Sequence, residues 1–261
     1  MEKMFIKLKI INDLVKIIKS YLTKSHIYLL NKKSKRVEAG EIIMHDPKLM
    51  ITARDILDKN TMFTTCARYG KLENMKWLFK NGYPYDETTF AFSAKNGNLE
   101  NMKWLLKKKI PYNNLTFVFA TVNGNLENME WLLENKFPYC EVPFAIAAKE
   151  GNLDTMKWLA KNNFPHNILT AEYAIFNGNL DNIKWLLENK FQFNEGMFEV
   201  AAEIGDLDIM KLLLANGIPY GQGVISFAIK KGNSENIKWL LENNFPYREY
   251  DREKLIKYKL L

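Results

Sequence analysis

The stretch GNLENMKWLL, residues 97–106, decides the fold because the chain repeats it. Near copies follow as GNLENMEWLL at residues 124–133, GNLDTMKWLA at 151–160 and GNLDNIKWLL at 178–187. A glycine recurs every 27 residues, at Gly70, Gly97, Gly124, Gly151, Gly178, Gly205 and Gly232. All six tryptophans share one further column of this period, at Trp77, Trp104, Trp131, Trp158, Trp185 and Trp239. Self-similarity at a fixed period predicts a repeat scaffold rather than a single catalytic site.

Each repeat is interpreted as two short helices, as residues 88–114 illustrate. The segment TTFAFSAKN carries small and apolar side chains, Phe90, Ala91, Ser93 and Ala94, that suit a tightly packed inner helix. Gly97 can end this helix because glycine readily takes the left-handed conformation. Asn98 can cap a second, outer helix, and Glu100 suits its first turn. Pro111 prevents that helix from continuing. The expected buried stripe of the outer helix is Leu99, Met102, Leu105 and Leu106.

Two helices and their turns fill the whole period, so we expect an all-α, helical-repeat solenoid. The period covers residues 61–247. It predicts seven two-helix units, at about 61–87, 88–114, 115–141, 142–168, 169–195, 196–222 and 223–247. Residues 1–60 lie outside the period and form a separate N-terminal helical segment in this interpretation, and residues 248–261 form a charged C-terminal cap.

The unit VPFAIAAKEGNLDTMKWLAKNN, residues 142–163, resembles an ankyrin repeat. The matching positions are Pro143, Ala147, Ala148, Gly151, Asp154 and Leu159. Ankyrin units usually have about 33 residues, and the residues missing here fall where the projecting β-hairpin should be, which implies shortened hairpins. The wording also resembles ankyrin-type proteins expanded in large DNA viruses of protists. That resemblance implies a viral protein that binds a host protein in the host cytoplasm.

Composition and charge bound the class of protein. The chain has 261 residues, of which 47% are hydrophobic, so it can bury a large core. Two cysteines, Cys66 and Cys140, favour a reducing compartment over a disulfide-stapled secreted domain. The lysines of the N-terminal run argue against a signal peptide and a transmembrane helix.

The net charge of +7 is unevenly distributed. Residues 1–36 hold ten basic and two acidic side chains, whereas residues 61–247 hold nineteen basic and twenty acidic ones. The predicted repeat array is therefore nearly neutral, which disfavours general nucleic-acid binding by the array.

No catalytic, cofactor-binding or metal-ligating residue is expected. The three histidines, His26, His45 and His166, are scattered, and none belongs to a recognisable metal or nucleophile pattern. The acid that follows each glycine by three residues is explained by the helix dipole. The tryptophans stand where the resemblance places a leucine and are expected to pack. Tyr112 and its equivalents leave two alternatives open, an exposed aromatic rim or packing against the next unit. We expect a non-enzymatic protein without a small-molecule substrate.

A binding surface should lie where the copies disagree. The resemblance implies that a protein partner meets the concave face, which means the two residues before each glycine and the one just before the inner helix. Unconstrained drift on a solvated face would give the same variation, so both readings stay open. The candidate partner-binding residues of a monomeric scaffold are Arg68, Tyr69, Lys95, Asn96, Val122, Lys149, Glu150, Phe176, Glu203, Ile204, Lys230 and Lys231.

The N-terminal segment has three interpretations. Residues 11–37 carry apolar side chains at helical spacing and end in a basic run. They could cap the first repeat, as a solenoid requires. They distantly resemble an F-box, which implies docking on the adaptor of a cullin-type ubiquitin ligase, although the usual Leu-Pro opening is replaced by Ile11-Asn12. They could also form a basic amphipathic helix on an anionic membrane, and a membrane-surface or nucleic-acid-associated scaffold is the alternative function.

Overall fold

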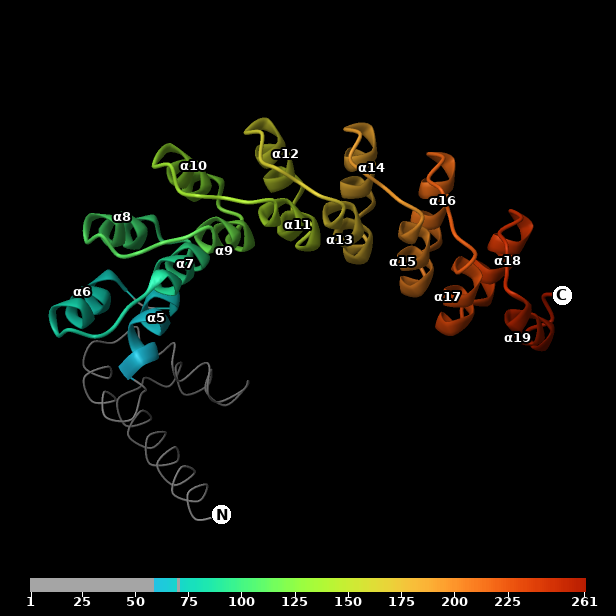
Figure 1. The fold of residues 1–261 in the computed structure, drawn as a ribbon, viewed down its shortest axis with the longest axis horizontal. Coiled ribbons are helices and arrows are strands. Elements are labelled where there is room, and N and C mark those ends of the chain that lie inside the picture. The colour runs from blue at the N-terminus through green and yellow to red at the C-terminus, as the bar shows by residue number, and fades with distance from the viewer. Residues whose placement is uncertain (1–58, 70) are drawn as a thin grey trace, which may run out of the picture. The chain divides into compact units, whose positions relative to one another are not determined.

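The computed structural model describes residues 59–69 and 71–261 (Figure 1). The chain divides into two compact units, residues 1–138 and 139–261. The described part of the first unit holds three helix pairs, which are α5 (Lys59–Tyr69) with α6 (Leu72–Lys80), α7 (Glu87–Asn96) with α8 (Leu99–Lys107), and α9 (Leu115–Asn123) with α10 (Leu126–Glu134). The interpretations of residues 1–58 lie outside the described residues.

The second unit holds four helix pairs and a C-terminal segment. The pairs are α11 (Val142–Lys149) with α12 (Leu153–Lys161), α13 (Leu169–Asn177) with α14 (Leu180–Glu188), α15 (Gly196–Ile204) with α16 (Leu207–Ala215), and α17 (Val224–Lys231) with α18 (Ser234–Glu242). The 3₁₀ helix η1 (Glu249–Asp251) and helix α19 (Arg252–Lys257) follow. The residues that the structure describes contain no strand, so the all-α solenoid class is confirmed and loops replace the hairpins.

Two rows of helices form within each unit. The odd-numbered helices from α5 to α17, here called the inner helices, contact their odd-numbered neighbours in the same unit. Each even-numbered helix from α6 to α18, here called an outer helix, packs against the inner helix that precedes it (Figure 1). This arrangement gives every inner helix one side against the core and one side away from the outer row.

The glycine column ends the inner helices as expected. Gly97, Gly124, Gly178, Gly205 and Gly232 all take the left-handed conformation at the C-terminus of their helix. Gly151 follows α11 with φ +72°. Gly70 lies outside the described residues.

Side chains cap the outer helices at the next position. The Oδ1 atom of Asn98 accepts a hydrogen bond from the backbone N–H of Asn101 at 3.2 Å. Equivalent caps come from Asn125, Asn152, Asn179, Asp206 and Asn233, and only α6, which follows Lys71, has no side-chain cap among the described outer helices. The expected acids lie in the first turns, at Glu73, Glu100, Glu127, Asp154, Asp181, Asp208 and Glu235.

A second left-handed column, which the sequence analysis did not predict, ends the outer helices. The backbone N–H of Ile110 donates to the carbonyl of Leu105, and that of Lys109 donates to Leu106. This is the Schellman arrangement, which requires a positive φ at Lys109. Its equivalents are Gly82, Lys136, Asn163, Lys190, Gly217 and Asn244.

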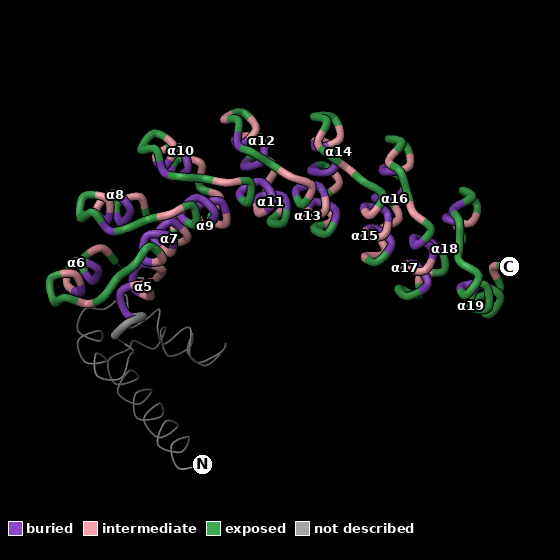
Figure 2. Tube along the Cα trace, in the orientation of Figure 1, coloured by how far each residue is buried: buried purple, intermediate pink, exposed green. Residues whose placement is uncertain are grey.

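The core lies between the two rows (Figure 2). In α8, Met102 and Leu105 are fully buried, as expected. Leu99 and Leu106 are only half-buried, so the predicted stripe is narrower than the sequence suggested. The inner helices bury Phe90 and its equivalents completely. Burial also raises the pKa of the Cys66 thiol to about 12, which keeps this core side chain neutral.

The aromatic columns pack, as one of the two alternatives proposed. Trp131 is half-buried, and its ring centroid lies 5.8 Å from that of Phe137, in the loop that follows its helix. The Tyr112 ring lies 4.1 Å from Phe137 of the following repeat. Tyr112 nevertheless stays 38% exposed, so one side of the ring packs while part of it faces solvent. The same contact recurs in the pairs Tyr139–Phe164, His166–Phe191 and Tyr220–Phe245.

The C-terminal segment packs on the last repeat. The side chain of Leu255 in α19 is buried, and η1 contacts α17. The Ser226 hydroxyl donates to the buried Asp251 carboxylate. The hydrogen bonds that the Tyr250 hydroxyl shares with Ser226 and Arg248 lower the pKa of its phenol.

Candidate partner-binding site

Each inner helix buries one side and leaves the opposite side accessible. In α9, Phe117, Val118, Ala120 and Thr121 are buried, whereas the side chains nine, five and two positions before Gly124 are not. Positions spaced by four and three residues lie on one face of a helix. We call these accessible side chains, nine, five and two positions before each glycine, the inner-helix face.

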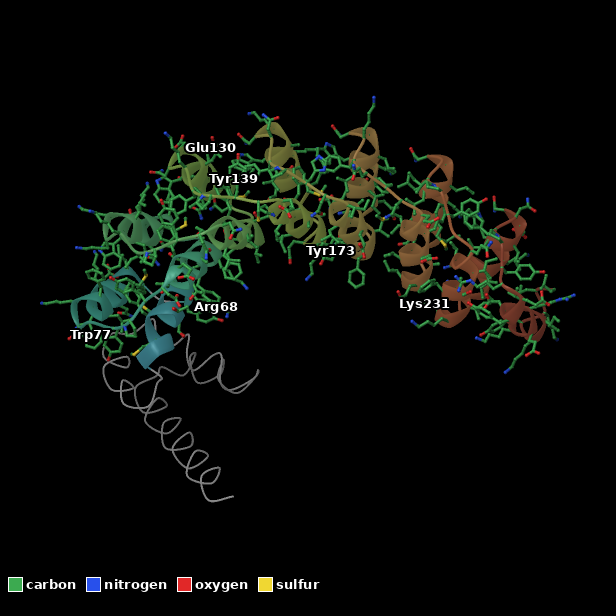
Figure 3. All side chains as sticks on the ribbon, viewed as in Figure 1. Arg68, Trp77, Glu130, Tyr139, Tyr173 and Lys231 are labelled. Carbon is green, nitrogen blue, oxygen red and sulfur yellow. The ribbon has the colours of Figure 1, made fainter. Side chains whose placement is uncertain are left out.

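The inner-helix face of the first unit consists of Thr65 and Arg68 on α5, Thr88, Phe92 and Lys95 on α7, and Leu115, Phe119 and Val122 on α9. In the second unit it consists of Val142, Ile146 and Lys149 on α11, Leu169, Tyr173 and Phe176 on α13, Gly196, Val200 and Glu203 on α15, and Phe227 and Lys230 on α17. Figure 3 labels Arg68 and Tyr173 on their inner helices, and Trp77 and Glu130 on outer helices.

Cations lie over aromatic rings on this face of the first unit. The Arg68 guanidinium carbon lies 4.7 Å from the Tyr69 ring centroid and 5.3 Å from that of Phe92. The Lys95 ammonium lies 5.6 Å from the Phe119 centroid. The Phe92 and Phe119 rings are 5.1 Å apart. The cation of one inner helix therefore covers the ring of the next, which is the geometry of a cation–π interaction.

In the second unit one such cation–ring contact joins neighbouring inner helices, and an ion pair replaces it further along. The Lys149 ammonium lies 6.0 Å from the Tyr173 centroid. Phe176 is 65% exposed, the largest exposure among the large apolar side chains of the described chain. Lys230, by contrast, forms a 3.0 Å ion pair with Glu203 of the preceding inner helix. Both partners are largely exposed, so this pair contributes little to stability.

An acidic cleft lies between α13, α15 and α17. It has a volume of about 270 Å³, and its lining includes Glu172, Glu199, Glu203 and Phe227. Gly196, Val200, Glu203 and Phe227 of the inner-helix face contribute to this lining. Its carboxylates give this part of the second unit a charge opposite to that of α5 and α7.

The candidate residues predicted from sequence all lie at the C-terminal ends of inner helices, and their role in binding stays a prediction. For three of the positions before glycine the structure supplies a structural role. The Asn96 side chain donates to the carbonyl of Arg68 at 2.8 Å. Asn123 donates to Lys95, and Asn177 donates to Lys149. Asn96 therefore links consecutive repeats, and this structural role explains its identity without a role in partner binding.

Sequence reasoning missed the columns five and nine positions before glycine. Their signal was present, because Phe92, Phe119, Tyr173 and Phe227 share one register of the period. From the sequence, these positions were placed in a tightly packed inner helix and given no role of their own. The structure leaves them half-exposed, and Leu115, Val142 and Leu169 are each 40% exposed. An apolar residue in a helix of this length does not by itself reveal which side faces the core.

Within the described residues, no group of three or more histidine, cysteine or carboxylate side chains could hold a metal ion. No helix in that part of the chain has both the length and the apolar character to cross a bilayer.

Comparison with known proteins identifies ankyrin repeats in part of the chain. Residues 173–254 match the family model "Ankyrin repeats (3 copies)". The match begins in α13 and extends into α19. No curated protein matches the chain. Ankyrin repeats generally mediate protein–protein interactions, and proteins built from them are generally non-enzymatic scaffolds.

Proposed function

We propose that this chain is a non-enzymatic scaffold that binds a protein partner on its inner-helix face. The observation that carries the proposal is the repeated placement of accessible apolar side chains on successive inner helices. In the first unit the ring of Phe92 lies next to that of Phe119. In the second unit α13 alone carries Leu169, Tyr173 and Phe176 on this face. The ankyrin match over residues 173–254 supports the same class of function.

The energetics favour this face as a recognition surface. Burying apolar surface contributes about 25 cal/mol per Å², and aromatic side chains anchored in packed surroundings dominate most protein interfaces. The rings of Phe92, Phe119 and Tyr173 already contact neighbouring side chains, so binding orders few new groups there. The framework columns, namely the glycines, the caps and the Tyr–Phe pairs, remain intact when the face is covered.

The test compares two apolar-to-acid substitutions. A partner is first identified by affinity capture and then purified, so that its Kd can be measured by calorimetry. Phe176→Asp should weaken binding at least about tenfold, as expected for loss of one aromatic anchor. Ile256→Asp on α19, where the side chain is 54% exposed but off the inner-helix face, is the matched control. Unchanged affinity of Phe176→Asp, with Ile256→Asp the weaker binder, would refute the proposal.

A further role is proposed for residues 1–60, namely presenting the bound partner to a cullin-type ubiquitin ligase in the host cytoplasm. The resemblance of residues 11–37 to an F-box supports it, as do the two cysteines, which favour a reducing compartment. The ten basic side chains of residues 1–36 support the alternative, attachment to an anionic membrane or to nucleic acid.

Truncation separates these roles. Full-length chain and residues 61–261 are compared for capture of a cullin adaptor, for binding to phosphatidylserine vesicles and for binding to duplex DNA. Adaptor capture that is lost on truncation favours the ligase role. Vesicle or DNA binding lost instead favours the alternative. Light scattering tests the expectation of a monomer, and circular dichroism verifies that the truncated chain is folded.

A further inference from the structure

We infer that α5, α7 and α9 recognise an extended, acidic segment of the partner, with carboxylates about three residues apart and an apolar side chain between them. The inference rests on the proposed function and specifies the ligand of the first unit alone. Its basis is the combination of two ring-supported cations, the absence of acids from this part of the inner-helix face, and the spacing of packed helices.

Among the described residues, no acid opposes the charge of this surface. Within residues 59–69 and 71–138, the inner-helix face carries Arg68 and Lys95 as its charged side chains and no carboxylate. Neither cation belongs to a salt bridge among the described residues. Lys230 in the second unit shows the contrast, since Glu203 already neutralises it.

Contact with two aromatic rings orients the Arg68 guanidinium to bind a carboxylate. Its guanidinium is held over both Tyr69 and Phe92. Contact with a ring uses the face of the planar group and leaves the N–H donors at its edge for a bidentate bond to a carboxylate. A side chain held in this way loses less conformational freedom on binding than a free one. Lys95 over Phe119 repeats the arrangement with a single-point donor.

Helix spacing sets the spacing of the ligand's acids. Arg68 and Lys95 occupy equivalent positions on consecutive inner helices. Packed helices lie roughly 8–10 Å apart, and a segment in the extended polyproline II conformation rises about 3.1 Å per residue with about three residues per turn. In such a segment residues three apart lie on the same face, roughly 9 Å from one another, so every third residue reaches the next cation. The neighbouring Phe92 and Phe119 rings accept the apolar side chain between the acids.

Single-stranded nucleic acid is less well matched, although it also combines anions with flat rings. A nucleic-acid groove tracks the backbone with a continuous line of cations. The line is interrupted here, because Val122 occupies the equivalent position on α9.

The chain's own N-terminal segment is a poor electrostatic match for this surface. Residues 1–36 hold ten basic and only two acidic side chains. Two cations on the face would repel such a segment at short range. A separate, acidic polypeptide is the better electrostatic match.

The test is selection from a random nine-residue peptide library on the purified full-length chain. Three forms are compared: the natural sequence, Arg68→Glu with Lys95→Glu, and the control Lys103→Glu with Lys107→Glu. The control changes two exposed lysines of the outer helix α8 and gives the same number of acidic substitutions. Pairs of acidic residues three apart should be enriched by the natural sequence and by the control. That enrichment should fall at least about tenfold with the inner-face variant, as loss of both ion pairs and their replacement by repulsion predicts.

Three results would overturn the inference. Acidic pairs could be enriched equally by all three forms, which would assign them to another basic region. They could fail to be enriched by the natural sequence. Oligo-dT could bind the natural sequence in an Arg68- and Lys95-dependent way while the peptides do not. None of these results bears on the Phe176→Asp measurement in the second unit, so failure of this inference is distinguishable from failure of the proposed function.

Discussion

The side-chain amide of Asn177 donates a hydrogen bond to the main-chain carbonyl of Lys149, 3.0 Å away and 28 residues earlier. This bond ties the end of α13 to the end of α11. It forms beside Gly151, where an added Cβ would lie only 2.8 Å from the Asn177 Oδ1 atom. The glycine therefore serves two purposes, a left-handed backbone and close approach of the next repeat.

We predict that Gly151→Ala destabilises the chain more than Gly178→Ala. Both residues have positive φ, and a left-handed alanine costs roughly 1–2 kcal/mol. At Gly178 nothing lies within 4 Å of an added Cβ, so that cost stands alone. At Gly151 the methyl group also displaces Asn177, which adds about 1 kcal/mol for the lost hydrogen bond. Urea denaturation of both variants measures the difference, and equal losses would show that the Asn177 bridge is unimportant.

The left-handed ends of the outer helices offer a stabilising substitution. Lys136 has φ +59° without the freedom of glycine, while Gly217 occupies the equivalent position elsewhere. Lys136→Gly should raise the free energy of unfolding by about 0.5–1 kcal/mol, because relief of left-handed strain exceeds the added entropy of the unfolded chain. The reverse control, Gly217→Ala, should lower it, since nothing near Gly217 compensates. A destabilised Lys136→Gly would contradict this account of the column.

A buried column on the outer helices distinguishes paired from unpaired polar groups. The Asn128 side chain donates to the carbonyl of Gly97 in the preceding repeat at 2.7 Å. Thr155 occupies the equivalent position in α12, and its buried hydroxyl has no partner. Asn128→Ala should cost about 1 kcal/mol, because it removes this part-buried hydrogen bond between repeats. Thr155→Val keeps the shape and should be neutral or stabilising. Thermal melts in which Thr155→Val is the more harmful change would overturn this interpretation.

Much of the fold was predictable because the signals that start and end a helix are local in the sequence. Gly97 and Asn98 determine a helix end and a helix start through backbone geometry and one side-chain bond, and neither requires knowledge of distant residues. The second left-handed column was missed because lysine fills three of its positions, including Lys109. The Gly82 and Asn163 equivalents were the available signal.

The candidate site was less predictable because it depends on packing between repeats. Asn96 looked like a variable surface residue, yet its amide bonds to Arg68 of the previous repeat. Phe92 was given no role from the sequence, yet it lies on the accessible side with Arg68 above its ring. Both distinctions follow from how one inner helix sits on the next, which a single repeat does not encode.

The central claim is that the 27-residue unit is the module that builds this molecule. In such arrays each unit contacts mainly its neighbours, so removing a whole unit restores equivalent contacts. Deletion of residues 169–195 joins α12 and its following loop to α15 in register. Deletion of residues 169–182 removes about half a unit and breaks that register.

Circular dichroism with urea denaturation on these two deletions tests the claim most directly. The account predicts that the chain lacking residues 169–195 keeps its helical signal per residue and a cooperative transition, whereas the chain lacking residues 169–182 loses both in part. Equal helical signal and equally cooperative transitions in the two deletions would contradict it.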